Sequence, residues 1–286
     1  MTNRNQPFLW PERNLFVRSP FVLLRPSLDA SVLAFFNAMP TALTAAEKTL
    51  INNFIVGLKA DALWNKIDGG NILCLRTEAQ CFIDFKVPSR VATTYVTPSY
   101  VFTANRQFMS DGNVDTTNLP ASINTGWNPS TAGGNYTDDS GHMAVWRIQS
   151  GGTTSARSFA GVNAGNDLLI GARSTSDTMV ARINAPTNDT YLGAGVSNNG
   201  NGFFLVSRTG DVSSYGQWDA TQGSDVATQS TGMPNGNVRV LQLASATAAL
   251  NTEGCSFISF GGGLSKPEGL LYNSRAQTLI TGLRAL

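Results

Sequence analysis

The chain has 286 residues, a formal net charge of +1 and 14% charged residues, while hydrophobic residues make up 42%. This hydrophobic content excludes an intrinsically disordered chain, and the lack of any block of Lys or Arg argues against nucleic acid as a partner. No apolar run approaches the roughly 20 residues of a membrane-spanning helix, and the N-terminus lacks the apolar stretch of a secretory signal, so membrane insertion is not expected.

Residues 1–26 are expected to form an irregular arm. Prolines at positions 7, 11, 20 and 26 separate short apolar clusters, and proline at this spacing prevents a regular helix. Two interpretations stay open, since such an arm can pack back on its own domain or dock on a neighbouring subunit as an assembly device. The large apolar residues expected to make these contacts are Phe8, Trp10, Leu15, Phe16 and Phe21.

Two helices are expected to follow the arm. Ser27 is a suitable N-cap for a helix from Leu28 to Ala38, which the next proline would stop. Thr44 and Glu47 have the spacing of a capping box and predict a second helix that ends near Ala60.

From Ile72 onward the pattern becomes that of β-strands. Many short apolar or alternating runs are separated by Gly- and Asn-rich turns, without intervening helices. This order favours an antiparallel β-sandwich or jelly roll over a parallel α/β sheet. A helix from Lys266 to about Ile280 is expected at the C-terminus. The predicted organisation is therefore an arm (1–26), a helical segment (27–70) and a β-sandwich domain with a C-terminal helix (71–286).

Cysteine and glycine usage indicates structural roles. Cys74, Cys81 and Cys255 are expected to be buried free thiols. Zinc and other cofactors are not expected, because no close cysteine pair exists and His142 is the only histidine. The glycine run 261–263 indicates a close approach of two backbone segments or a bulge.

The most informative motif of the chain is the turn TGWNPS at residues 125–130. Further distinctive segments are Asn105–Phe108, Ser110–Gly112, Leu63–Asp68, Ser259–Gly263 and Gln277–Leu283. Together these motifs resemble those of virion proteins from tailed bacteriophages and prophages, whose domain is a concanavalin A-like (LamG-like) β-sandwich. The resemblance extends in patches over roughly residues 43–283, and the arm lies outside it.

The resemblance implies a concanavalin A-like sandwich and a structural role in a virion. The position would be a tail, fibre, baseplate or capsid decoration, in a protein made in the cytoplasm of a bacterial host. Its partners would be other virion proteins and further copies of itself, and symmetric assembly as a homotrimer is expected. Two alternatives remain open, a protein that binds glycans on the host surface and a glycan hydrolase.

The residues give little indication of catalysis, and the chain is not expected to be an enzyme. A retaining glycosidase needs two carboxylates about 5 Å apart, yet the glutamates are scattered along the chain. A serine nucleophile would need His142 as its base, and no G-x-S-x-G motif is present. His142 is therefore expected to make an ordinary structural hydrogen bond, and no catalytic residue is predicted.

Two binding sites are weaker candidates. Asp111, Asn113 and Asp115 alternate oxygen-bearing side chains in a glycine loop, a pattern that Ca²⁺ accepts and that Asx turns also produce. Glycan binding would use aromatic side chains exposed in loops. The candidates for it are Trp127, Tyr136 and Trp218, with Tyr215 in similar sequence.

Overall fold

The computed structural model describes residues 28–95, 100–111, 122–149, 160–162, 165–171, 178–192, 201–241 and 251–286. The predictions for the arm, including Phe8, Trp10, Leu15, Phe16 and Phe21, lie outside these residues. Among the described residues, no helix has the length and apolar character needed to cross a bilayer.

The described strands form two sheets in which neighbouring strands run antiparallel. The larger sheet has eight strands, and its central strand β15 (Asn251–Gly261) pairs with β6 on one side and with β4 and β1 on the other. In spatial order its strands are β13 (Thr221–Gln222), β12 (Ser213–Trp218), β11 (Gly202–Gly210), β6 (Gly141–Gln149), β15, β4 (Gln107–Asp111) and β3 (Tyr100–Thr103), with β1 (Ile67–Ile72) beside β15.

The smaller sheet has seven strands and faces the larger one. In spatial order they are β10 (Asp189–Leu192), β9 (Met179–Ala185), β8 (Asp167–Gly171), β7 (Ala160–Val162), β14 (Arg239–Val240), β5 (Ser122–Asn124) and β2 (Thr93–Tyr95). These sheets confirm the predicted antiparallel β-sandwich.

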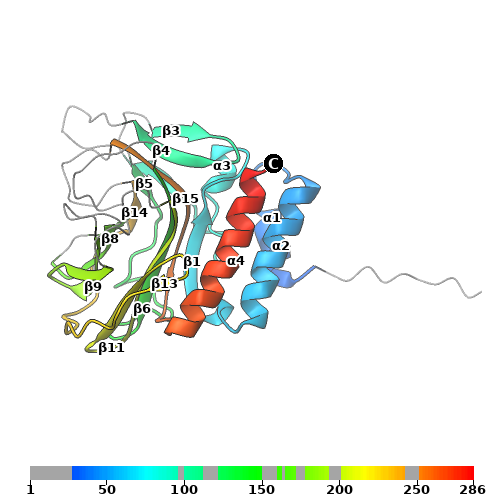
Figure 1. Ribbon diagram of the computed structural model, residues 1–286. Helices are drawn as coiled ribbons and strands as arrows, with labels where there is room; N and C mark the ends of the chain where they lie inside the picture. Colours follow the sequence, from blue (N-terminus) through cyan, green and yellow to red (C-terminus); the bar gives the residue numbers. More distant parts are fainter. Residues whose placement is uncertain are drawn as a thin grey trace, which may run out of the picture.

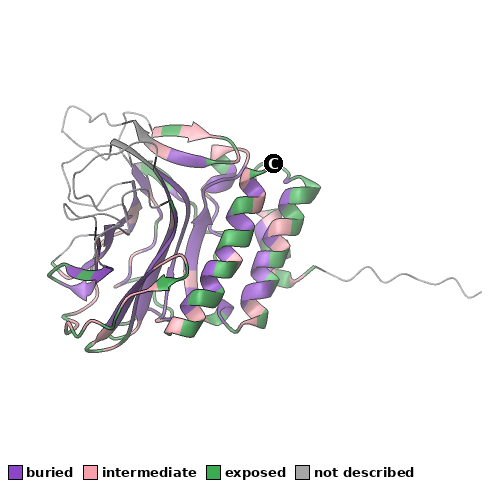
Figure 2. Ribbon diagram, viewed as in Figure 1, coloured by how far each residue is buried: buried purple, intermediate pink, exposed green. Residues whose placement is uncertain are grey.

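Figure 1 shows that the helices form a third layer on the outer side of the eight-stranded sheet. This layer consists of α1 (Ala30–Asn37), α2 (Ala45–Ala60) and α4 (Lys266–Arg284). A short 3-10 helix, Trp64–Lys66, leads from α2 into β1. In Figure 2 the buried residues of α2 and α4 lie on the sides of the helices that face the sheet. The eight-stranded sheet is therefore covered on both faces, which lets both faces of its strands be apolar.

The helix caps explain where α2 and α4 begin. Thr44 accepts a hydrogen bond from the Glu47 amide, and the Glu47 carboxylate accepts one from the Thr44 amide, as predicted. Ser265 and Glu268 form the same capping box at α4. The predicted N-cap of α1, Ser27, is wrong, since α1 begins at Ala30 and the Asp29 carboxylate caps it through the Ser31 amide.

The helices α2 and α4 pack closely at two glycines. A side chain at Gly57 would meet the Arg275 guanidinium within 3 Å, and one at Gly282 would meet Leu50 at 2.6 Å. Arg275 crosses α2 at this point and pairs with Asp61 at 2.8 Å. Leu50, early in α2, lies against Gly282, late in α4, so the two helices run antiparallel.

Two local predictions differ from the structure. One of the short apolar runs after Ile72, at residues 81–85, does not form one of the strands, because Glu78–Cys81 form the short helix α3, capped by Thr77 and Gln80. The capping box there outweighs the strand preference of the apolar residues that follow it. The helical segment expected for residues 27–70 ends early, because β1 begins at Ile67 and pairs with β15.

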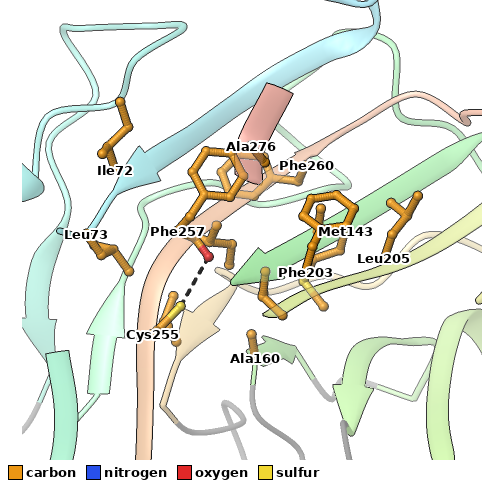
Figure 3. Close-up of a cluster of buried hydrophobic side chains, with 14 of the residues drawn as sticks. Ile72, Leu73, Met143, Ala160, Phe203, Leu205, Cys255, Phe257, Phe260 and Ala276 are labelled. Atoms are coloured by element: carbon orange, nitrogen blue, oxygen red, sulfur yellow. Dashed lines mark hydrogen bonds between the residues drawn. The ribbon is translucent and has the colours of Figure 1, made fainter. Parts of the chain in front are cut away.

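The core fills both interfaces of the three layers. On the helix side of the eight-stranded sheet, Phe257 packs between Phe85 and Tyr272. Figure 3 shows the neighbourhood of Phe257, with the Cys255 thiol donating to the Phe257 carbonyl at 3.2 Å. The prediction for the cysteines is confirmed, as Cys74, Cys81 and Cys255 are buried and free. Burial raises the pKa of the Cys74 thiol to about 12, which makes it unreactive at neutral pH.

Candidate functional site

The segment that follows β5 carries the TGWNPS motif, and the structure places this motif against β14 and β15. The Thr125 hydroxyl donates to the Val238 carbonyl at 2.8 Å, and the Val238 amide donates to the Trp127 carbonyl at 2.9 Å. The Trp127 ring stacks on Phe260, with 4.1 Å between ring centroids and 13° between ring planes. Two motifs that lie far apart in the sequence therefore pack on each other.

Asp68 joins a third motif to the same region. Its carboxylate accepts hydrogen bonds from the Asn135 amide at 2.8 Å, the Asn135 side chain at 2.7 Å and the Tyr136 amide at 2.9 Å. Gly134 precedes these residues with a φ of +108°, and a side chain there would collide with the Asp68 carboxylate. Three of the motifs thus meet in one structural cluster, which we call the motif cluster: Asp68, Thr125, Trp127, Tyr136 and Phe260.

The glycine run also acts in this cluster. A side chain at Gly261 would lie 2.1 Å from the Lys66 carbonyl, and the Gly262 amide donates to that carbonyl at 2.8 Å. The predicted close approach of two backbone segments is confirmed. The cluster therefore ties β1, β15 and the segment between β5 and β6 together.

Tyr136 closes the cluster toward the seven-stranded sheet. Its hydroxyl donates to the Asn184 side-chain oxygen at 2.6 Å, and the Asn184 amide donates to the Thr137 and Asp138 carbonyls. Asn184 holds a positive φ of 56°, which asparagine tolerates better than most residues. Asn184 was not predicted from the sequence, although its side chain makes three hydrogen bonds, one with Tyr136 and two with backbone carbonyls.

The expectation that Trp127 and Tyr136 are exposed for glycan binding is wrong. Trp127 is fully buried and Tyr136 is 3% exposed, so neither ring has a free face for a sugar. Tyr215, the fourth aromatic considered, is 3% exposed within β12. Trp218 alone of these candidates is partly exposed, stacks on Phe204 and donates from its indole nitrogen to the Asn201 carbonyl at 3.3 Å.

The described residues bring no metal site together. Asp111 is the last residue of β4, while Asn113 and Asp115 lie outside the described residues. Within the described ranges, no group of three His, Cys, Asp or Glu side chains is close enough to hold a metal ion. The predicted calcium site therefore stays a prediction.

His142 lies under α4, away from the surface. It is fully buried, its Nδ1 donates to the Gly262 carbonyl at 2.6 Å, and its ring meets Tyr272 edge-on. Burial lowers the pKa of His142 to about 4, although the Gly262 hydrogen bond opposes this shift. The imidazole is therefore neutral at pH 7 and enclosed by protein, in agreement with the expected structural hydrogen bond.

The outer side of α2 and α4 is a surface that sequence reasoning did not identify. Between the helices runs a groove lined by Asn53, Ser274 and Thr278 together with Leu50, Phe54, Arg275 and Leu279. Val56 and Leu271 lie one helical turn from the lining residues and are 43% and 46% exposed. We call Asn53, Val56, Leu271, Ser274 and Thr278 the outer helical surface.

This outer helical surface carries almost no free charge. All five of its defining residues are uncharged, and the nearby charges are paired, Arg275 with Asp61 and Lys59 with Asp29. Depletion of charge around exposed aliphatic residues is typical of the centre of a protein–protein interface. The sequence signal that could have identified this surface is the mixture of small polar and aliphatic residues on the helix faces that turn away from the core.

The sequence matches no protein family model and no curated protein. Among solved structures it is similar to a tryptophan-to-alanine mutant of the domain designated HCR/D, with 9% identity, a TM-score of 0.51 and coverage of 73% of this chain and 53% of the other. It also matches the binding domain of botulinum neurotoxin serotype D (9%, TM-score 0.47, 73% and 53%) and a Trypanosoma rangeli sialidase (11%, TM-score 0.49, 81% and 40%). The match thus spans about half or less of these longer chains, and identities this low show similarity of fold alone.

The comparisons correct one expectation. The chain was expected not to be an enzyme, yet sialidases are among the structures that it matches, so a general exclusion of enzymes is wrong. At 10–11% identity the match does not show this protein to be an enzyme either. What the findings support is the β-sandwich fold alone.

Proposed function

We propose that the protein is a structural component of a phage-like particle and attaches to its neighbours through the outer helical surface and the N-terminal arm. The observation that carries this proposal is the uncharged outer helical surface with its exposed aliphatic residues. The sequence resemblance to phage virion proteins supports it. Three of its motifs build the motif cluster, as expected if they specify a fold rather than a reactive site.

Assembly as a homotrimer belongs to the same proposal. A virion component that occupies a symmetry axis would bring the outer helical surfaces of several copies, or of one copy and a different virion protein, into contact. The partners are thus other virion proteins and further copies of this chain, and the location is the particle itself.

A charge on the outer helical surface should block assembly. Replacing Val56 with Asp places a carboxylate where the proposed contact would desolvate it, so incorporation into particles should fall at least about tenfold. Val212 provides a matched control, because it is 54% exposed in the turn between β11 and β12, which is not part of the helical layer. Particles from cells that express each variant would be purified and the incorporated protein quantified by immunoblot.

Two outcomes of this comparison are decisive. Normal incorporation of Val56→Asp, with the fold verified by circular dichroism, would contradict the proposed surface. An equal loss for Val212→Asp would show that the effect is not specific to the helices.

Glycan binding on a host surface is the second candidate, and Trp218 is the observation that favours it. Its ring is partly exposed at the end of β12, beside the polar residues Asn201 and Asp219. Aromatic rings next to amide and carboxylate groups are suited to contact a sugar ring and its hydroxyls.

If Trp218 contacts a glycan, Trp218→Ala should weaken binding to purified bacterial surface polysaccharide about tenfold or more, the loss expected for a central contact residue. Val212→Ser, in the turn at the other end of β12, should bind as the parent protein does. Surface plasmon resonance on immobilised polysaccharide would measure both. Equal binding by the Trp218→Ala variant, or no binding by the parent, would remove this candidate.

A further inference from the structure

A second groove, between α1 and α2, lies where the described chain begins. It has a volume of about 310 Å³ and is lined by Leu28, Phe36, Ala45, Lys48, Thr49 and Asn52. Its floor is apolar, and the Lys48 ammonium lies 6.0 Å from the centre of the Phe36 ring. Leu28, the first described residue, is 48% exposed and lines the groove.

We propose that this groove binds the apolar segment Phe21–Leu24 of the same chain. Leu24 is four residues from Leu28 and can reach about 13 Å from it, while Phe21 can reach about 23 Å. The groove residues Ala45 to Asn52 extend about 10 Å along α2. The segment is therefore within reach of its own groove over the whole groove length.

The local sequence favours occupancy by the same chain over a second copy. Pro26 would occupy the second position of a turn Arg25–Leu28, where proline is preferred, and such a turn would send residues 21–24 back along the helices. A linker this short gives a high effective concentration, which a segment from another molecule does not have. The bound segment would also cover the apolar surface of Leu28 that is now exposed to water.

This assignment divides the arm into two parts. The segment Phe21–Leu24 anchors the arm on its own helices, which leaves residues 1–20, with Phe8, Trp10, Leu15 and Phe16, to reach a neighbour. The inference does not depend on the proposed virion role, because it concerns a contact within one molecule and is tested on the purified protein.

A pair of cysteines tests the contact directly. In Leu24→Cys/Thr49→Cys, a short thiol crosslinker should join the two positions within one molecule, and peptide mass spectrometry would identify the bridge in protein of monomer mass. The control, Leu24→Cys/Ser274→Cys, places the second thiol at an exposed position on α4 and should give at least about tenfold less bridge. The three native cysteines are buried and should not react in the folded protein.

Each outcome supports or overturns the inference. Bridging in monomers of the Thr49 variant alone supports it. A Leu24–Thr49 bridge found only in covalent dimers shows that a second copy occupies the groove. No bridge in either variant, or equal bridging in both, shows that the segment does not reside there. Binding of Val56→Asp to particles is measured separately, so failure of this inference and failure of the proposed function are distinguishable.

Discussion

Replacing Trp127 with alanine should lower the free energy of unfolding by about 3–5 kcal/mol, the range for deletion of a large aromatic side chain from a core. Trp127 is fully buried, stacks on Phe260 and meets Tyr136 edge-on at 5.3 Å between ring centroids. Its removal would leave a cavity between the motif turn and β15. Both neighbouring rings would lose packing contacts that no other described side chain could restore without a shift of the backbone.

Two further variants, Trp127→Phe and Trp218→Ala, test whether the loss of stability comes from the packing of the Trp127 ring. Trp127→Phe should cost less than Trp127→Ala, because the indole nitrogen has no hydrogen-bond partner among the described residues and a phenyl ring can keep the stack on Phe260. Trp218→Ala, at a partly exposed ring, should cost less than about 2 kcal/mol. Urea unfolding followed by circular dichroism would measure all three. A loss for Trp127→Ala no larger than that for Trp218→Ala would contradict the structural role of the motif turn.

Acidification should destabilise the protein through His142 by about 3 kcal/mol between pH 6.5 and pH 4. The folded-state pKa of about 4 lies below the ordinary value of 6.5, so the unfolded chain binds the proton more tightly. Stability from this group is therefore complete above pH 6.5 and is lost as the pH falls toward 4. The charges that act on the ring, Asp68, Lys66 and Glu268, are weaker influences than burial.

The variant His142→Asn isolates this effect. Its side-chain amide can still donate to the Gly262 carbonyl but does not titrate, so the variant should be less stable at pH 7.5 and less sensitive to acid below pH 6.5. Carboxylates with lowered pKa values, such as those of Asp29 and Asp61, contribute equally to both proteins. Identical dependence of unfolding free energy on pH in the two proteins would show that His142 is not the group responsible.

Local signals predicted the fold well where the deciding contacts are local. The Thr44–Glu47 capping box lies within one helical turn, and the strands follow from apolar runs between turn residues. The N-cap of α1 was predicted at Ser27 instead of Asp29, and the Asp29–Lys59 ion pair at 2.6 Å is a contact between distant residues that the local sequence does not show.

The candidate sites depended on contacts between distant segments, which single-sequence patterns do not reveal. Trp127 follows a glycine in a polar loop and has the sequence context of an exposed aromatic, yet Phe260 and Tyr136 enclose it. The outer helical surface was missed for a related reason. Val56 and Leu271 look like ordinary helix residues until the packing of α2 on α4 shows which side stays uncovered.

The central claim, that this protein is built into a particle, is tested most directly by crosslinking mass spectrometry on purified intact particles. The account predicts that the protein is present in several copies per particle, with crosslinks from Lys48 or Lys59 in the helical layer to another virion protein or to a second copy. Absence of the protein from the purified particles, with all of it recovered in the soluble fraction of the cells that produce them, would contradict the account.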